Sequence, residues 1–574
     1  MRHKAVWRRD SVDERHIALI LIINPIKRTF EDINRMSSEP LVFARKSSGL
    51  VKEVSLADYV VWLMYAALIF FFNLLVFPVY MLELPGASIP LAILFGCLIG
   101  MPFFVTYGAL GSIMPRSGGD YVYQSRGIHA AVGLAITLAL GLLVVTSETF
   151  SALALDSVST DALGPYFLVV GTELHNSSLA ALGSFIGSSE GIMTVGIALL
   201  VLGFALYLAG MKWIAKIQRY VMLPAIVLSG IAIPLMFLTG SPIANFNSLS
   251  ASISGNPDTY HLILNGVAAM GYSPPPFSLE NTLIMGIIFG TTAIGGVIFA
   301  NPLLGEVKRA NHFRNLTLSY LIAGFITGLL FLLPELGLLV SSYGSNFVQS
   351  SAFAALVGLK GTQAGIPLTY GFLALAASNN VVLQTLSIFG FVAVAFMFPV
   401  IILMAAGRFF IGQSIDGVLP MWFSSVNRHV KRPVNSVVLP FVLTGVVLYV
   451  VSSSFEGLLL FVGLGTIYTF ILEGASSLSA ILMPIRQKFI VNASPLAKYP
   501  WVMQLSGALV VIIAIVETYL YYSVPSLALS IGLIGYAWMI LGTLAGFVIY
   551  FAMREYKKRL GIDITLAFKE VPPS

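Results

Sequence analysis

Two glutamates, Glu148 and Glu473, interrupt long apolar stretches of the sequence, where they could do proton chemistry. A charge near the middle of a bilayer costs about 2.5–3.5 kcal/mol on insertion scales, so acids in such stretches are rare and usually functional. Removal from water favours the neutral form of a carboxyl group, which can then carry a proton. Two interpretations stay open for each glutamate: a proton carrier, or a protonated acid that only makes hydrogen bonds within a helix bundle.

A second chemical feature is the apolar stretch 283–304, which carries Gly295-Gly296 in its middle and Pro302 close behind. Each glycine inside a helix costs roughly 1 kcal/mol against alanine, and proline removes a backbone donor. Unpaired backbone at membrane depth is tolerated only against protein or a water-filled cavity. The pattern therefore predicts a broken helix that lines a transport site. The alternative is that the glycine pair only lets another helix approach closely.

The composition places these residues in a membrane protein. Hydrophobic residues make up 57% and charged residues 10% of the chain, and the mean hydropathy is +0.89. Soluble domains carry about 25% charged residues, so the sequence predicts a polytopic membrane protein. With Cys97 as its single cysteine, it predicts no disulfide, no metal site and no cofactor. The net charge of +6 does not indicate a nucleic-acid partner, because the basic residues follow membrane topology.

Twelve apolar runs are long enough to span a bilayer, which takes about 20 residues. Their predicted cores are 56–82, 89–112, 127–155, 191–209, 217–238, 283–304, 316–340, 381–411, 434–451, 457–483, 501–522 and 527–553. If the N-terminus is inside, only Lys360 of the 32 basic residues falls on the outer side. Because basic loops stay on the cytoplasmic side, this bias predicts twelve helices in the plasma membrane with both termini cytoplasmic.

Three of the predicted outer loops are long: residues 156–190, 240–281 and 341–380. Asp156 is expected at the membrane interface, where the first of them begins. The third contains two short apolar pieces, 352–359 and 367–377, which are expected to lie over the outer mouth. Before the first span, residues 1–35 are interpreted as an interfacial segment or as the product of a start assigned too early.

Four motifs, taken in order along the chain, resemble the prokaryotic permeases of the amino acid–polyamine–organocation (APC) superfamily. The family's loop after helix 2 is similar to Met114-Pro-Arg-Ser-Gly-Gly-Asp-Tyr-Val-Tyr-Gln-Ser-Arg126, and its link between helices 4 and 5 to Gly210-Met-Lys-Trp-Ile-Ala-Lys-Ile-Gln218. The charged exit of its helix 6 resembles Glu306-Val-Lys308. The exit of its helix 8 resembles the segment from Gly407-Arg408 to Arg432-Pro433.

The resemblance implies an all-α polytopic membrane protein with a leucine-transporter-like fold, in which two inverted repeats of five helices are followed by two more. The implied units are a cytoplasmic arm at 1–53, repeat 1 at 54–239, an extracellular loop at 240–280, repeat 2 at 281–484, helices 11 and 12 at 501–553, and a cytoplasmic tail at 554–574. In this family helices 1 and 6 are broken at mid-membrane and hold the substrate between them.

The resemblance also implies a substrate site. Half-helix N-termini would meet a carboxylate, and freed backbone carbonyls would meet an ammonium group. The implied residues are Phe72, Asn73, Thr291, Thr292, Ile294, Gly295, Gly296, Val297 and Phe299. Helix 1 departs from the family pattern, since it has no glycine at mid-span and Asn73 is its one polar side chain there. Asn73 is interpreted as a substitute for bare backbone or as a bridge between two helices.

The loop after the second span holds candidates for an inner gate. Arg116 is a candidate for closing the gate against an acid such as Asp416, and Asp120 for capping the third helix. The alternative for both is an ordinary inner anchor and helix cap.

The eighth helix bears on the coupling ion. Sodium-coupled relatives of this fold use hydroxyl groups on that helix, but residues 388–406 contain no Ser or Thr. The lysine that some family members carry on helix 5 is missing from residues 220–238. The sequence therefore predicts no sodium dependence, and either proton coupling through Glu148 or Glu473 or simple exchange.

Together these features predict a secondary-active transporter of amino acids or related small organic amines that works by alternating access. The predicted partners are a small-molecule substrate and the bilayer. A membrane enzyme or a channel-like protein is the alternative. The histidines fall near helix ends, in loops or in the arm, so they indicate no catalytic cluster: His3, His16, His129, His175, His261, His312 and His429. A channel is disfavoured because the sequence has no filter-like repeat.

Overall fold

The computed structural model describes residues 52–72, 82–142, 147–290, 296–357, 368–427 and 432–571. Within these ranges every regular element is a helix, apart from one isolated parallel bridge between Val54 and Val307. Ten of the described helices are long and apolar enough to cross a membrane. A helix satisfies its backbone hydrogen bonds within one segment, which is what lipid demands of a spanning element.

The first half of the chain forms a compact series of helices that ends at Thr239. Its elements are α2 (Leu56–Phe72), α4 (Ile89–Ile99), α5 (Met101–Ile113), α6 (Gly119–Gly127), α7 (Ala130–Leu142), α8 (Ser147–Ser157), η1 (Val158–Leu163), α9 (Gly164–Glu173), α10 (Ser177–Ile186), α11 (Ser189–Ala209), α12 (Met211–Ile217), η2 (Gln218–Met222) and α13 (Leu223–Thr239). Two short helices, α14 (Pro242–Ser254) and α15 (Thr259–Ala269), lead into the second half.

The second half contains the longest helices. Its elements are α16 (Leu279–Met285), η3 (Gly286–Gly290), η4 (Gly296–Glu306), α18 (Phe313–Phe325), η5 (Ile326–Leu332), α19 (Leu333–Tyr343), α20 (Ser345–Val357), α21 (Tyr370–Leu375), α22 (Val381–Ile415), η6 (Met421–Ser424), α23 (Asn435–Ser453), α24 (Phe455–Arg486), α25 (Lys488–Asn492), η7 (Pro495–Lys498), α26 (Pro500–Ser523), α27 (Pro525–Arg559) and η8 (Ile564–Lys569).

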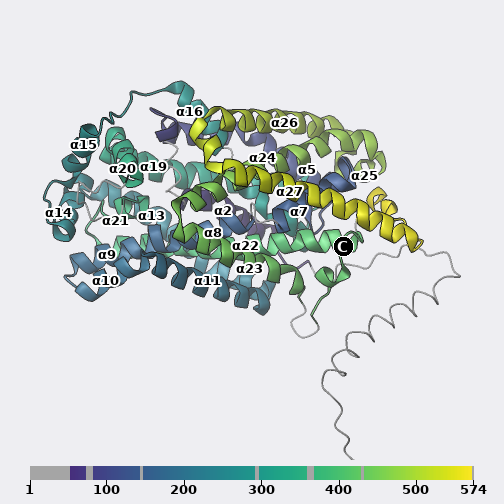
Figure 1. Cartoon of the computed structure of the whole chain (residues 1–574), viewed down its shortest axis with the longest axis horizontal. Helices are drawn as coiled ribbons and strands as arrows, with labels where there is room; N and C mark the ends of the chain where they lie inside the picture. Colours follow the sequence, from purple (N-terminus) through teal and green to yellow (C-terminus); the bar gives the residue numbers. More distant parts are fainter. Residues whose placement is uncertain are drawn as a thin grey trace, which may run out of the picture.

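Helix α22 forms the centre of the bundle. In its most apolar stretch 89% of the residues are buried, against 28% for the last span, Ile531–Arg559. Figure 1 shows α22 among α2, α8 and α23, with α26 and α27 along one side of the molecule. A helix that is apolar all round is stable only when neighbours cover it, so the sequence of α22 requires this central place.

The long helices begin and end close to the predicted residues, as α11, α22 and α26 show. The predicted spans 56–82, 127–155 and 283–304 contain residues outside the described ranges, so the total of twelve stays a prediction. The arm, residues 1–51, also lies outside the described residues.

The first predicted outer loop, 156–190, is mostly helical, because the helix that precedes it continues into it. Helix α8 passes through the π-helical turn η1 into α9, so that Thr149–Glu173 forms a single span. Pro165 follows closely after the π-helical turn η1, so this turn takes up the break in hydrogen bonding and the helix continues. The second predicted loop contains α14 and α15, and the third contains α20 and α21.

The two ends of the bundle differ in charge. The helices α10, α14, α15 and α20 gather at one end, away from the C-terminal tail (Figure 1). The other end, called the basic end below, carries the basic residues of the connecting segments: Arg116, Lys212, Arg219, Lys308 and Arg432. The predicted topology places the basic end in the cytoplasm.

Candidate functional site

The candidate site centres on a segment that is not a regular α-helix. Helix α16 ends at Met285 and passes into the π-helical turn η3, and after residues 291–295 the chain continues as the 3-10 helix η4. Runs of 3-10 helix longer than three or four residues are uncommon and often mark functional hinges. Pro302 lies inside η4 and has no N–H for a regular α-helical bond. The predicted sixth span therefore departs from α-helix on both sides of residues 291–295.

Most of the predicted substrate residues lie at the borders of the described structure. Outside it are Asn73, Thr291, Thr292, Ile294 and Gly295. Phe72 ends α2, Gly296 and Val297 begin η4, and Glu148 is the second residue of α8; only their places in the helices are described.

Phe299 is the one predicted substrate residue whose side chain is described. It is buried on η4, and the centre of its ring lies 5.6 Å from that of Phe150 on α8. The predicted third and sixth spans therefore meet beside the candidate site.

Asn301 joins three tyrosines from three other helices. Its buried Oδ1 accepts hydrogen bonds from the hydroxyl groups of Tyr320 on α18 and Tyr123 on α6, at 3.0 and 3.3 Å. The Tyr320 hydroxyl also lies 3.0 Å from that of Tyr59 on α2. Asn301 was not among the predicted site residues, although a polar side chain directly before Pro302 in an apolar run was a usable signal.

Asn301 also has hydrogen-bonding capacity to spare. Its Nδ2 has no hydrogen-bond partner among the described residues. The nearest acceptor is the Asp120 carboxylate, which lies within interaction range of the Asn301 side chain.

Asp120 does not cap a helix, contrary to the prediction. Gly118 is the N-cap of α6, because residues 118 and 119 both have positive φ and turn the chain into the helix one step earlier. The buried Asp120 carboxylate instead accepts a hydrogen bond from Ser476 Oγ of α24 at 2.8 Å. Gln124 Nε2 donates to the same hydroxyl at 3.0 Å. The Tyr107 hydroxyl and the Asn301 amide also lie within interaction range of this carboxylate, so Asp120 connects α6 with α5, η4 and α24.

Glu473, the second predicted proton carrier, lies buried on α24. Its Oε1 has no hydrogen-bond partner among the described residues. The buried carboxyl groups of Glu517 on α26 and Asp120 lie close enough to interact with it electrostatically. Helices α24 and α26 approach tightly here, since a Cβ on Gly474 would lie 3.4 Å from the Cβ of Ala514. Neighbouring buried carboxyl groups cannot all be charged without a large cost, so the cluster is suited to holding protons.

The acid of the predicted gate has a different basic partner. Asp416, the C-cap of α22, pairs with Arg126 at the end of α6, at 2.6 Å from Nη1 to Oδ2 and 2.8 Å from Nη2 to Oδ1. Arg116 was the predicted partner, but its guanidinium lies 3.5 Å from the Pro115 carbonyl oxygen. The correction follows from α6: Arg126 lies ten residues further along the chain, where the end of α6 meets the end of α22.

The C-terminal tail covers this ion pair. Arg126 also donates to the backbone carbonyl groups of Ala567 and Glu570, at 3.3 Å each. The ring of Phe568, which is itself buried, lies 5.2 Å from the guanidinium carbon. The arginine thus has partners on α6, α22 and the tail at once.

Further ion pairs and one backbone contact connect the helices at the basic end. Arg408 of α22 and Glu306 at the end of η4 form a buried ion pair at 2.7 Å. Asp58 of α2 pairs with Arg219 of η2 at 2.8 Å, in a half-exposed position. Val54, just before α2, forms the isolated bridge to Val307. The first and sixth predicted spans are therefore joined by backbone as well as by side chains.

The loop before α6 lies directly against η4. The N–H of Gly118 donates to the Pro302 carbonyl at 3.1 Å. A Cβ on Gly119 would lie 2.9 Å from the Pro302 nitrogen, and one on Gly305 would overlap Ser117. Only glycine permits this backbone-to-backbone contact, which explains the Gly-Gly pair in the loop motif.

At the opposite end, Asp156, Asp161 and Glu335 are also buried. Asp156 was expected near a helix end, but the helix that carries it continues to Glu173. The Tyr370 hydroxyl of α21 lies 3.5 Å from Glu335 Oε2. All six residues of α21 are buried, so this short helix packs into the bundle.

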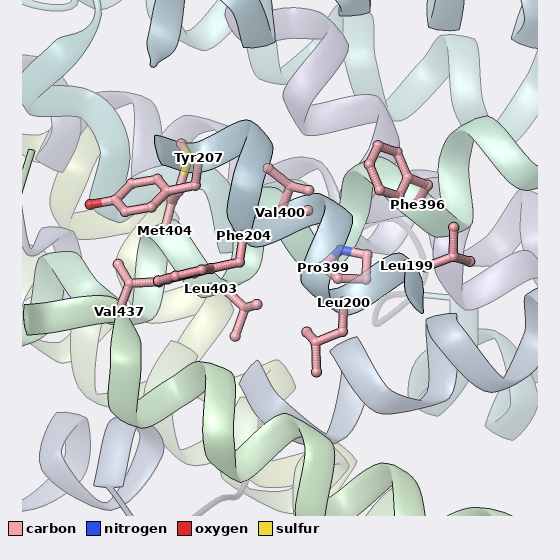
Figure 2. A pocket seen from close by; sticks show the side chains of 11 residues that line it. Leu199, Leu200, Phe204, Tyr207, Phe396, Pro399, Val400, Leu403, Met404 and Val437 are labelled. Atoms are coloured by element: carbon pink, nitrogen blue, oxygen red, sulfur yellow. The ribbon is translucent and has the colours of Figure 1, made fainter. Parts of the chain in front are cut away.

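Two hollows lie outside the centre of the bundle. One, at the basic end, has an empty volume of about 1480 Å³ and is lined in part by Lys52, Arg116 and His312. The other is an apolar groove between α11, α22 and α23, shown in Figure 2. No group of three or more His, Cys, Asp or Glu side chains suited to a metal occurs among the described residues.

The fold and this site define a multi-pass, all-helical membrane protein with buried acids beside an irregular helix. A family model described as "Amino acid permease" matches residues 52–568, and the chain belongs to that family, within the APC superfamily. Among solved structures, the crystal structure of MhsT in complex with L-phenylalanine is similar, with a TM-score of 0.46 and 14% sequence identity over 83% of this chain and 98% of that one. The comparison with curated proteins found no match.

Proposed function

We propose that this permease is a secondary-active transporter of the plasma membrane that moves amino acids or related small organic amines by alternating access. The observation that carries the proposal is the irregular segment from η3 to η4, at which α2, α6 and α18 meet through Asn301. In a member of an amino acid permease family, a helix that departs from α-helical geometry in this way is suited to line a site for a zwitterion or an ammonium group.

The substrate lies between the ends of α2 and η3 and the start of η4 in this proposal. Phe72, Asn73, Thr291, Thr292, Ile294, Gly295, Gly296, Val297 and Phe299 then line it. The buried Phe299–Phe150 contact supports an apolar wall on this side of the substrate. The inverted repeats remain 54–239 and 281–484, with the basic end in the cytoplasm.

In this proposal the ion pairs at the basic end act as the inner gate. For the substrate to leave on that side, α2 and η4 have to move away from α6 and α22. The two ion pairs of Arg126–Asp416 and Arg408–Glu306 hold these segments together. Because both pairs are buried, opening is favourable only if water or other groups replace their contacts.

Protons are the proposed coupling ion, with simple exchange as the alternative mode. Glu473 lies within electrostatic reach of Asp120, and Asp120 is bonded to α24 and lies on the same helix as Tyr123. The Asp120 carboxylate also lies within interaction range of the Asn301 side chain on η4, so a proton on this acid cluster would alter that contact. Glu148, on α8, is the second candidate for the same role.

Counterflow with the purified full chain tests the proposed class. Proteoliposomes preloaded with a mixture of unlabelled amino acids and amines, and matched empty ones, would receive a trace of one labelled compound at a time. Faster uptake into preloaded vesicles, saturable and selective for a few compounds, is the expected result. Equal, non-saturating uptake into both would favour a channel, and chemical conversion of the label would favour an enzyme.

A further inference from the structure

The apolar groove between α11, α22 and α23 opens toward lipid and away from the transport core. Its walls include Leu199 and Phe204 of α11, Pro399 of α22 and Val437 of α23, and its empty volume is about 300 Å³. Its enclosed part, about 10 Å³, holds about one water, so the feature is a shallow surface groove and not a closed ligand cavity. Both outer walls continue as exposed apolar surface, with Leu202 at 55% and Val442 at 52% exposure.

The groove runs from the middle of α11 to the end of that helix at the basic end. Figure 2 shows Tyr207, Met404 and Val437 at one end of it and Leu199 and Phe396 at the other. On α11, Leu199 and Tyr207 are eight residues apart, which corresponds to about 12 Å of helix. Half of a bilayer's hydrocarbon core is about 15 Å deep. The groove therefore covers most of the depth of one leaflet.

Cationic groups stand where the groove reaches the membrane surface. The Arg432 guanidinium packs over Gly210, since a Cβ on that glycine would lie 2.6 Å from Nη2. Tyr207, at the end of the groove, donates to the carbonyl group of Pro433, the next residue. Within the described part of the chain the Arg432 guanidinium has no hydrogen bond or ion pair, although it is only partly exposed. Exposed Lys212 and Trp213 follow Gly210 at the same surface.

We propose that this groove is a binding site for an anionic phospholipid. One acyl chain lies along the groove between α11 and α22, and the phosphate meets Arg432, with Lys212 adding positive charge. An arginine fork matches the oxygens of a phosphodiester, and basic residues near the membrane surface attract anionic lipid. Placement in the inner leaflet rests on the proposed topology, but lipid binding itself does not depend on transport.

The bound chain would stabilise the central helix. Pro399 interrupts the hydrogen bonds of α22 inside the membrane, and it faces the groove. A chain packed there fills the space between α22 and its two neighbours, so binding favours the assembled arrangement of these three helices.

The test is the melting temperature of the purified protein in detergent, with added phosphatidylglycerol or phosphatidylcholine of the same acyl chains. We expect phosphatidylglycerol to raise the melting temperature clearly more than phosphatidylcholine. Native mass spectrometry should show one retained phosphatidylglycerol. An equal effect of the two lipids would overturn the proposal.

Two variants with matched controls locate the site. Arg432→Gln should remove at least half of the phosphatidylglycerol effect, whereas Lys498→Gln, at an exposed basic residue of η7, should keep it. Leu199→Trp fills the groove and should weaken retention of the lipid, whereas Leu202→Trp, on the exposed face of the same helix, should not. If Leu199→Trp does not fold, Arg432→Gln alone tests the lipid site. A full lipid effect in Arg432→Gln contradicts the proposal.

Discussion

Arg126 and Asp416, 290 positions apart in the chain, form a two-point ion pair from which water is excluded on both sides. The pair fixes the end of α6 to the end of α22, and the C-terminal tail covers it through Ala567 and Phe568. Two of these three elements must separate if the basic end is to open. The pair is therefore both a structural tie and part of the proposed inner gate.

Removing one member of this pair should strongly destabilise the protein. Asp416→Asn leaves a buried guanidinium without its counter-charge, and such losses cost about 3–5 kcal/mol. The melting temperature in detergent should fall markedly, and it should recover in part in the double variant with Arg126→Gln. Glu555→Gln, which breaks the exposed pair with Arg559, should change it little. If Asp416→Asn and Glu555→Gln shifted the melting temperature by similar amounts, the stabilising role of the buried pair would be contradicted.

A methyl group on Gly119 should disturb the contact between the α6 loop and η4. Its Cβ would lie 2.9 Å from the Pro302 nitrogen, which is backbone and cannot move aside easily, and φ at this residue is +32°. Gly119→Ala should lower the melting temperature and slow counterflow. Gly337→Ala is the control, because a Cβ there meets nothing within 4 Å and alanine favours helix. Unchanged behaviour of Gly119→Ala would mean that the loop does not press on η4.

The long helices could be predicted from the sequence because apolar length alone specifies them in a membrane. The extension of α8 to Glu173 could not, since Asp156 and Asp161 are typical of a helix end until their burial is known. The helices α14, α15 and α20, at the end opposite the basic end, lie in segments whose polar composition is typical of loops. Their stability comes from packing, such as the stacking of Tyr260 on Phe347, which no local pattern records.

Surface labelling tests the proposed orientation. Cysteines at Ser345 and Ser252, both exposed at the end opposite the basic end, should react with impermeant reagents on intact cells. A cysteine at Asn492, the exposed last residue of α25, should react only after the membrane is opened. The native Cys97 is buried, so it should contribute little labelling of its own. Labelling at Asn492 in intact cells would mean that the predicted orientation or the predicted number of twelve helices is wrong.

Gly296→Leu tests the substrate site at the start of η4. If the substrate lies against this residue, the leucine side chain occupies its space, so binding should be lost while the protein stays folded. Gly337→Leu adds the same side chain on α19, where a Cβ would meet no atom within 4 Å. Thermal shifts with the compounds found by counterflow would measure binding in both. Unchanged affinity in Gly296→Leu would leave only a packing role for the glycine pair.

The candidate site was only partly visible in the sequence. Gly295-Gly296 and Pro302 marked the irregular segment, because both residue types act on the local backbone. The partners of Asn301 could not be inferred, since Tyr59, Tyr123 and Tyr320 come from three distant helices. The choice of Arg126 over Arg116 for Asp416 likewise depends on where α6 ends.

Gradient-driven uptake into proteoliposomes tests the proposed mechanism most directly. A substrate found by counterflow would be offered with a proton gradient, a sodium gradient or neither, to the native protein and to the Glu473→Gln and Glu148→Gln variants. We expect accumulation with the proton gradient alone, lost in Glu473→Gln while counterflow persists. If only Glu148→Gln loses the proton-driven accumulation, the proton site is assigned to Glu148 on α8. Counterflow without accumulation under any gradient would identify an exchanger. Accumulation driven by sodium alone would contradict the mechanism.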